Sequence, residues 1–108
     1  GKEQRMGLAE QAYRRGLQLL RTCGVENRSR EYKTLLGLAE VLKKNRVLTE
    51  SLALAEEAQK VMLDMNEGRE TKELVPVLKL QAEIYDMTND YARSTEFEQK
   101  AMLLKFKR

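Results

Sequence analysis

Apolar residues recur every three or four positions along most of this chain, with charged residues between them. The clearest stretch runs from Leu78 to Ala101. There LKLQAEIYDM and YARSTEFEQKA each place their small and apolar residues on one helical face, and TND between them suits a tight turn. No run alternates apolar and polar residues over the length of a strand. The pattern predicts an all-α fold.

The same periodicity predicts about five antiparallel helices. We expect them over residues 2–22, 31–44, 49–65, 75–87 and 91–107. The residues expected to face inward in the first, second, third and fifth helices are Met6, Ala9, Ala12, Tyr13, Gly16, Leu17 and Leu20; Tyr32, Leu35, Leu36, Ala39 and Leu42; Leu48, Leu52, Ala55, Ala58, Met62 and Met65; and Ser94, Phe97, Ala101 and Leu104.

Capping residues and proline set the expected helix ends. Thr49 and Asp90 are the expected N-caps of the third and fifth helices. Pro76 is tolerated only in a first turn, so the fourth helix should begin near Val75. Gly24 is expected to end the first helix in a left-handed conformation.

An internal repeat relates these helices. Leu35, Ala39, Leu42, Ser51, Ala55 and Ala58 precede Leu78, Ala82, Tyr85, Ser94, Glu98 and Ala101 by 43 residues each, and Ala9, Tyr13 and Gly16 precede Ser51, Ala55 and Ala58 by 42. A fixed period in this range predicts a stacked helical array. Small residues such as Ala82 and Ser94 would let paired helices approach to roughly 8 Å.

The repeated residues resemble the tetratricopeptide repeat. Leu78, Ala82 and Tyr85 match the large, small and aromatic positions of the family's first helix, and Ser94 and Ala101 match the small positions of its second. Asn89-Asp90-Tyr91 is similar to the family's Gly-Asp-Tyr turn. The long period is similar to the kinesin light chain type of repeat. The family's tryptophan and helix-ending proline are missing.

The resemblance implies a single domain built as a right-handed α-α superhelix. Residues 1–24 would be the second helix of a truncated first repeat, residues 31–65 a second repeat, and residues 72–108 a third repeat with the C-terminal helix. A chain of 108 residues is long enough for one such domain. A fragment of a longer protein, or self-association through an exposed first helix, is expected because the array starts in the middle of a unit.

The resemblance also implies protein binding through the concave face lined by the first helix of each repeat. The expected partner is a protein or peptide, and the chain would act as a scaffold within a larger assembly. The residues expected to line this face are Lys33, Leu36, Gly37, Glu40, Lys43 and Lys44 in one repeat and Lys79, Leu80, Glu83, Asp86 and Met87 in the next.

Glu40 and Glu83 bear on one form of peptide recognition. Some related domains hold a C-terminal carboxylate with a clamp of Lys and Asn side chains, and these two glutamates occupy the asparagine sites. A glutamate would repel a carboxylate. The resemblance therefore implies a protein partner without a carboxylate clamp.

The positive charge of the chain raises nucleic acid as a second class of partner. The net charge is +3, and residues 2–46 carry eleven basic against five acidic residues. The basic residues that nucleic acid could contact are Arg14, Arg15, Arg21, Arg28, Arg30, Lys33, Lys43, Lys44 and Arg46. Only Tyr13 and Tyr32 could offer base stacking among them, and charges of both signs are interspersed along the chain. Nucleic-acid contact through this basic half is therefore the alternative hypothesis, less favoured than protein binding.

Catalytic chemistry finds little support in the composition. The chain has no His, and its one cysteine, Cys23, has neither a catalytic partner nor a disulfide partner. No glycine pattern fits a phosphate-binding loop. We expect a non-enzymatic protein with no metal or cofactor. The lone cysteine favours an intracellular location, cytoplasmic or nuclear, and no apolar run approaches the roughly 20 residues of a membrane helix.

Overall fold

The computed structural model describes residues 2–22 and 27–107, with side chains from residue 7 onward. The expectations for Met6, Cys23 and Gly24 fall on side chains or residues outside this description. The helices are α1 (Lys2–Thr22), α2 (Arg28–Lys44), α3 (Leu48–Met65), α4 (Val75–Met87) and α5 (Tyr91–Lys105), and a short 3-10 helix, η1 (Lys72–Leu74), precedes α4.

The all-α prediction is confirmed, since the described residues form helices and turns without a strand. The start of α4 at Val75 is as predicted, with Pro76 in the first turn. Asp90 caps α5 by accepting a hydrogen bond from the Arg93 amide at 3.3 Å. The prediction that Thr49 caps the third helix is wrong, because the helix already begins at Leu48 after Val47. α2 also starts three residues early, because Asn27 accepts from the Arg30 amide.

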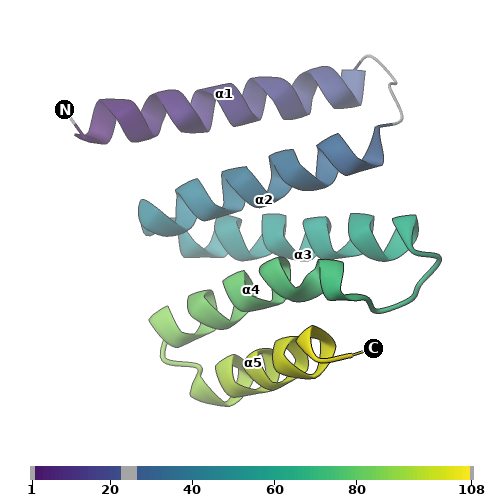
Figure 1. Ribbon diagram of the computed structural model, residues 1–108. Helices are drawn as coiled ribbons and strands as arrows, with labels where there is room; N and C mark the ends of the chain where they lie inside the picture. Colours follow the sequence, from purple (N-terminus) through teal and green to yellow (C-terminus); the bar gives the residue numbers. More distant parts are fainter. Residues whose placement is uncertain (1, 23–26, 108) are drawn as a thin grey trace.

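The helices follow one another in chain order through a flat molecule (Figure 1). α1 packs on α2, α2 on α3, α3 on α4 and α4 on α5, while α2 also touches α4. The molecule measures 36 × 33 × 18 Å. A helix with its side chains is about 10–12 Å across, so the short dimension accommodates two layers of helices.

A continuous apolar core joins the helices. Its fully buried side chains include Leu35, Leu38, Leu42, Leu74 and Leu78. Burying one such leucine stabilises the fold by roughly 1.5–3 kcal/mol.

Three residues predicted to face the core are exposed instead. Ala12 lies on the open side of α1, and Tyr13 of α1 and Met65 at the end of α3 are each 37 % exposed. α1 has a neighbouring helix on one side of its stripe, and Met65 lies where α3 ends, so these positions are covered only in part.

Two helical hairpins, α2–α3 and α4–α5, share the same close contact. The buried Ser51 hydroxyl donates to the Ala39 carbonyl at 2.6 Å, and the buried Ser94 hydroxyl donates to the Ala82 carbonyl at 2.9 Å. A side-chain hydrogen bond to a carbonyl in the facing helix requires closely approaching backbones. The repeat detected along the chain is therefore also a repeat of packing.

The turns of both hairpins match as well. Arg46 and Asn89 occupy equivalent positions with φ of 62° and 65°. In each turn the following amide donates to a carbonyl five residues earlier, Val47 to Leu42 at 2.9 Å and Asp90 to Tyr85 at 2.8 Å. This pattern is the Schellman motif, which ends a helix with a left-handed residue.

α1 is fastened to the first hairpin on two sides. The Tyr13 ring covers Gly37 of α2 so closely that a Cβ on Gly37 would lie 2.5 Å from Tyr13 Cε1. Ion pairs then tie α1 to α3: Arg14 reaches Glu50 at 2.9 Å, and Arg21 pairs with Glu57. Among the predicted inner residues of α1 whose side chains are described, Leu17 is the one that is buried.

Candidate functional site

The faces of α2 and α4 that point away from the core carry most of the predicted partner-binding residues. Lys33, Glu40 and Lys44 are exposed on α2. On α4 the exposed residues are Lys79, Glu83 and Asp86. Three of the other five candidates are half-buried, and they are Leu36, Lys43 and Met87. Because α2 touches α4, these residues belong to one surface, which we call the α2–α4 face.

One ion pair crosses this face. The Lys43 ammonium pairs with the Glu83 carboxylate, joining α2 to α4. The Lys43 side chain is 20 % exposed and that of Glu83 57 %. Pairs this accessible to water contribute about 0–1 kcal/mol. The pair therefore links α2 to α4 with little gain in stability, and it removes both charges from those open to a partner.

Two residues predicted on this face lie elsewhere. Leu80 is 3 % exposed and belongs to the core, so its placement on the partner-binding face was wrong. Gly37 is covered by Tyr13 of α1. A single-helix pattern reveals neither the contact of α1 with Gly37 nor the burial of Leu80 in the core.

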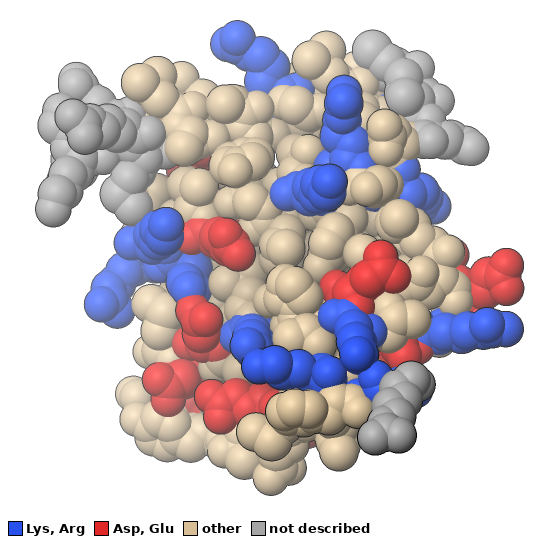
Figure 2. Space-filling view, viewed as in Figure 1, with Lys and Arg blue, Asp and Glu red and all other residues tan. Residues whose placement is uncertain are grey.

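The remaining charges of the α2–α4 face have no partner within the described part of the chain. Lys33, Glu40, Lys44, Lys79 and Asp86 make no ion pair with any residue that the structure describes. Figure 2 shows one side of the molecule, where basic side chains predominate in its upper part and acidic and basic ones mix in its lower part. The basic bias of the first half of the chain is therefore visible at the surface.

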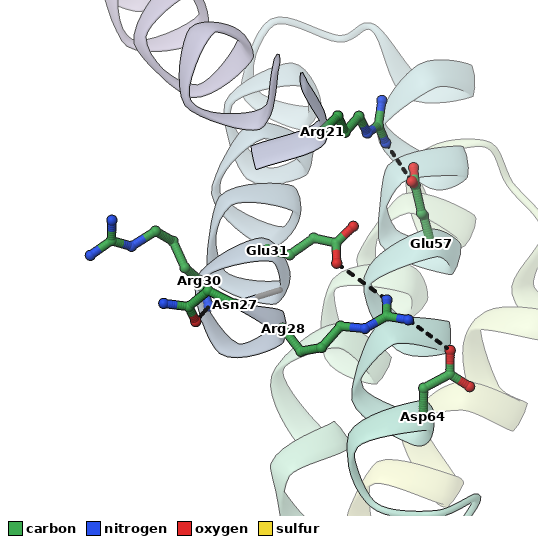
Figure 3. A network of polar contacts seen from close by, with 7 residues as sticks. All are labelled: Arg21, Asn27, Arg28, Arg30, Glu31, Glu57 and Asp64. Carbon is green, nitrogen blue, oxygen red and sulfur yellow. Dashed lines mark hydrogen bonds and ion pairs between the residues drawn. The ribbon is translucent and has the colours of Figure 1, made fainter. Parts of the chain in front are cut away.

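Ion pairs reduce that basic bias. Four of the nine basic residues considered for nucleic-acid contact are paired, and they are Arg14, Arg21, Arg28 and Lys43. Arg28 bridges Glu31, at 3.2 Å, and Asp64 of α3, at 3.9 Å, while Arg30 beside it points away (Figure 3). A paired guanidinium offers less charge to a phosphate, which weighs against a nucleic-acid surface here.

Arg14 contacts two carboxylates, one in its own helix and one in α3. Its side chain donates to Glu50 and, within α1, to Glu10, both at 2.9 Å. The hydrogen bond to Glu50 raises the pKa of the guanidinium, the one to Glu10 adds to this, and the Arg14 hydrogen bond lowers the pKa of Glu50. The geometry fastens α1 to α3 and leaves Arg14 engaged in structure.

A groove between α4 and α5 was not anticipated from the sequence. It encloses about 410 Å³, and Met102 and Phe106 on its wall are 62 % and 73 % exposed. The available signal was the position of Met102, Leu103 and Phe106 off the stripe of Ser94, Ala101 and Leu104. An apolar residue outside the inward stripe of a helix marks a second face to be covered.

Neither a metal centre nor a membrane span is found in the described part of the chain. No group of three or more His, Cys, Asp or Glu residues is placed to hold a metal ion within residues 2–22 and 27–107. No helix over the same ranges combines the length and apolar character needed to cross a membrane.

No protein-family model, curated protein or solved structure matches this chain. The resemblance to the tetratricopeptide family therefore rests on the repeated residues themselves and stays a prediction.

Proposed function

We propose that this chain is a non-catalytic protein-interaction module of the tetratricopeptide type, coiled as a right-handed superhelix, that binds a partner peptide or helix through the α2–α4 face. Two equivalent hairpins with the same serine contact and the same turn support the repeat architecture. They make α2 and α4 equivalent as the first helix of each unit. Recognition would then rest on a surface repeated along the array.

The observation that carries the proposal is the state of the charges on this face. Lys33 and Lys44 are exposed on α2 and Asp86 on α4, and no described residue pairs with any of them. Accessible charges of opposite sign favour selection of a complementary segment and faster encounter with it. The partner proposed is a protein segment with acidic residues for Lys33 and Lys44 and a basic residue for Asp86.

Selection from a displayed peptide library, followed by titration of the chosen peptide against the isotope-labelled chain, tests the proposal. Backbone amide shifts should concentrate around Lys33, Glu40, Lys44, Lys79 and Asp86. The double variant Lys33→Glu with Lys44→Glu should weaken binding roughly tenfold or more, as expected for two charge contacts of about 1 kcal/mol each.

Lys60→Glu is the control for charge reversal at another surface. Lys60 is an exposed lysine on α3 with no described ion-pair partner, and its reversal changes the net charge without touching the α2–α4 face. It should leave the affinity within about twofold after correction for net charge. Shifts confined to α3 and α5, or equal losses from the control and the double variant, would overturn the proposal.

A further inference from the structure

The groove between α4 and α5 has an apolar floor and wall, and charged residues of both helices also line it, namely Lys79 and Glu83 of α4 and Glu98 and Lys105 of α5. Ala82 and Ala101 form its floor, and Met102 and Phe106 its exposed wall. Glu98 and Lys105 lie seven residues apart on α5, two helical turns, so they stand at opposite ends of the groove. Neighbouring Leu103 is 74 % exposed but does not line it.

The repeat shows what occupies the equivalent surfaces of α1 and α3. Ala101 of α5 corresponds to Ala58 of α3 and Gly16 of α1. A Cβ on Gly16 would lie 3.9 Å from Thr34 Cγ2 of α2, so α2 lies against this position of α1. On α3, Ala58 is fully buried, and the adjoining Gln59 accepts a hydrogen bond from Gln81 of α4 at 2.9 Å. Each time, the next helix of the chain is seated there.

We propose that the α4–α5 groove is a docking site for one amphipathic helix of a partner protein, seated on α5 as α4 is seated on α3. The groove borders the α2–α4 face and shares Lys79 and Glu83 with it. The inference does not depend on binding at Lys33 and Lys44 of that face. The partner helix would run antiparallel to α5. Tyr13 covers Gly37 while Gly16 faces Thr34, so α2 runs antiparallel to α1, and the same direction applies to an equivalent seat.

The chemistry of the seat indicates the residue that should enter it. Leu17 of α1 and Leu38 of α2, the helix that packs on it, are both buried and line one cavity. The same two positions on α3 and α4 are Gln59 and Gln81, which bond to each other. At this contact an apolar side chain therefore packs against an apolar one, and a polar side chain bonds to a polar one. Met102 takes this position on α5, so the partner helix should present an apolar side chain.

The end charges add an orientation. In an antiparallel helix the first turn lies near Lys105, and the residue two turns later lies near Glu98. An acidic residue in the first turn and a basic one about seven positions on would complement both charges. The partner is thus an amphipathic helix with apolar residues at spacings of three and four, of the kind that other helix-binding grooves take.

Two synthetic peptides provide the probe. One has the sequence of residues 70–89, which includes η1 and α4, and the second carries Gln81→Leu within it. Fluorescence anisotropy with the complete chain should show the leucine peptide binding roughly tenfold more tightly, because the glutamine amide would lie unpaired against Met102. The chain variant Met102→Gln should reverse that preference by restoring a pair of amides.

Matched chain variants test whether the peptide binds in this groove. Met102→Glu should abolish binding of the leucine peptide, whereas Leu103→Glu, an equally drastic change at an exposed neighbour, should leave it within about twofold. Lys33→Glu with Lys44→Glu should also leave it unchanged, so failure here and failure of binding at the α2–α4 face can be told apart. Thermal melting checks that each variant is folded.

Three results would overturn the proposal. The first is absence of binding by both peptides. The second is binding that Met102→Glu does not weaken, which would mean that the peptide displaces α4 from α3. The third is a chain dimer in sedimentation that Met102→Glu dissociates, which would make a second copy of the chain the occupant instead of a partner helix.

Discussion

Ser51 and Ser94 are 43 residues apart and make the same hydrogen bond in their two hairpins. Each is buried on the second helix of a hairpin, and each hydroxyl donates to the carbonyl of an alanine twelve residues earlier, at 2.6 Å and 2.9 Å. A serine here is small enough for the helices to approach and polar enough to satisfy a carbonyl of the facing helix. The contact explains why small residues at these positions carry the repeat.

Replacing either serine should destabilise the fold by a similar amount. Ser51→Ala and Ser94→Ala each remove one buried hydrogen bond and keep the small side chain, so each should lower the free energy of unfolding by about 1 kcal/mol. Urea denaturation followed by circular dichroism measures this. Thr95→Ala, next to Ser94 but exposed, is the control and should change stability by less than about 0.5 kcal/mol. A control loss equal to that of Ser94→Ala would contradict the role given to the hydroxyl.

The turn at Arg46 stores strain that glycine would relieve. Arg46 has φ of 62°, a region that costs most side chains roughly 1–2 kcal/mol. Arg46→Gly should therefore stabilise the chain by about 0.5–1 kcal/mol after the entropy of glycine in the unfolded state is counted. Asn89 has the equivalent φ of 65°, but asparagine tolerates it and Asn89 also accepts a hydrogen bond from Tyr91. Asn89→Gly should gain less, and the reverse order of melting temperatures would refute the difference in strain.

Tyr13 and Gly37 should be energetically coupled. Glycine within a helix is less stable than alanine by roughly 0.5–1 kcal/mol, but a Cβ on Gly37 would meet the Tyr13 ring. Gly37→Ala should stabilise the chain by about that amount in a Tyr13→Ala background and gain less, or destabilise, in the natural chain. A double-mutant cycle measures the difference. Equal effects in both backgrounds would show that Tyr13 does not rest on Gly37.

Tyr32 should make stability fall at alkaline pH. Its hydroxyl donates to the Glu73 carbonyl at 3.2 Å, and burial, with the nearby charge of Glu73, raises its pKa above 10.0. Because the pKa of Tyr32 is higher in the folded state than in the unfolded state, its contribution to stability is fully present below pH 10. That contribution is lost as the pH rises through the folded-state pKa. Tyr32→Phe should cost roughly 0.5–1.5 kcal/mol at neutral pH and flatten the alkaline decline. Tyr91→Phe, at an exposed tyrosine, should leave the decline unchanged in denaturation curves across this range.

Glu40 should keep the chain from binding free carboxylates. It is exposed on α2 among Lys33, Lys43 and Lys44, where an asparagine could donate a hydrogen bond that a carboxylate cannot. A peptide with an acidic C-terminus should bind weakly to the natural chain and several-fold more tightly to Glu40→Asn by calorimetry. The control is Glu56→Asn, which makes the same charge change at an exposed position on α3 and should leave the affinity for the peptide unchanged. Binding to the natural chain that Glu40→Asn does not strengthen would show that Glu40 repels no carboxylate.

Much of the fold follows from local signals in the sequence. Helix class and most ends depend on periodicity, Pro76 and the Asp90 cap, all of which act within a few residues. The cap predicted at Thr49 failed because the left-handed Arg46 turns the chain directly into α3 at Leu48. The sequence does not predict this Schellman turn, because arginine takes the place of the glycine that usually marks one.

The candidate surface was harder to predict, because exposure depends on neighbours. Lys33, Glu40 and Asp86 are exposed as expected, but Leu80 is covered by packing between helices. Nothing in the sequence distinguishes Met102 and Phe106 from other apolar helix residues. The packing of α4 on α3 is what suggests that the equivalent surface of α5, which includes them, is a docking site. Such residues are identified by comparing equivalent positions in space.

The bond between Gln59 and Gln81 has a consequence for how the chain finds its fold. A chain of similar units can dock the wrong helix, since α2 and α4 hold equivalent places in the repeat. Docking α2 on α3 in place of α4 would set Leu38 against Gln59 and strand an amide, at a cost of about 1–3 kcal/mol. The hydrogen bond between the two glutamines therefore favours α4 over α2 at this position on α3.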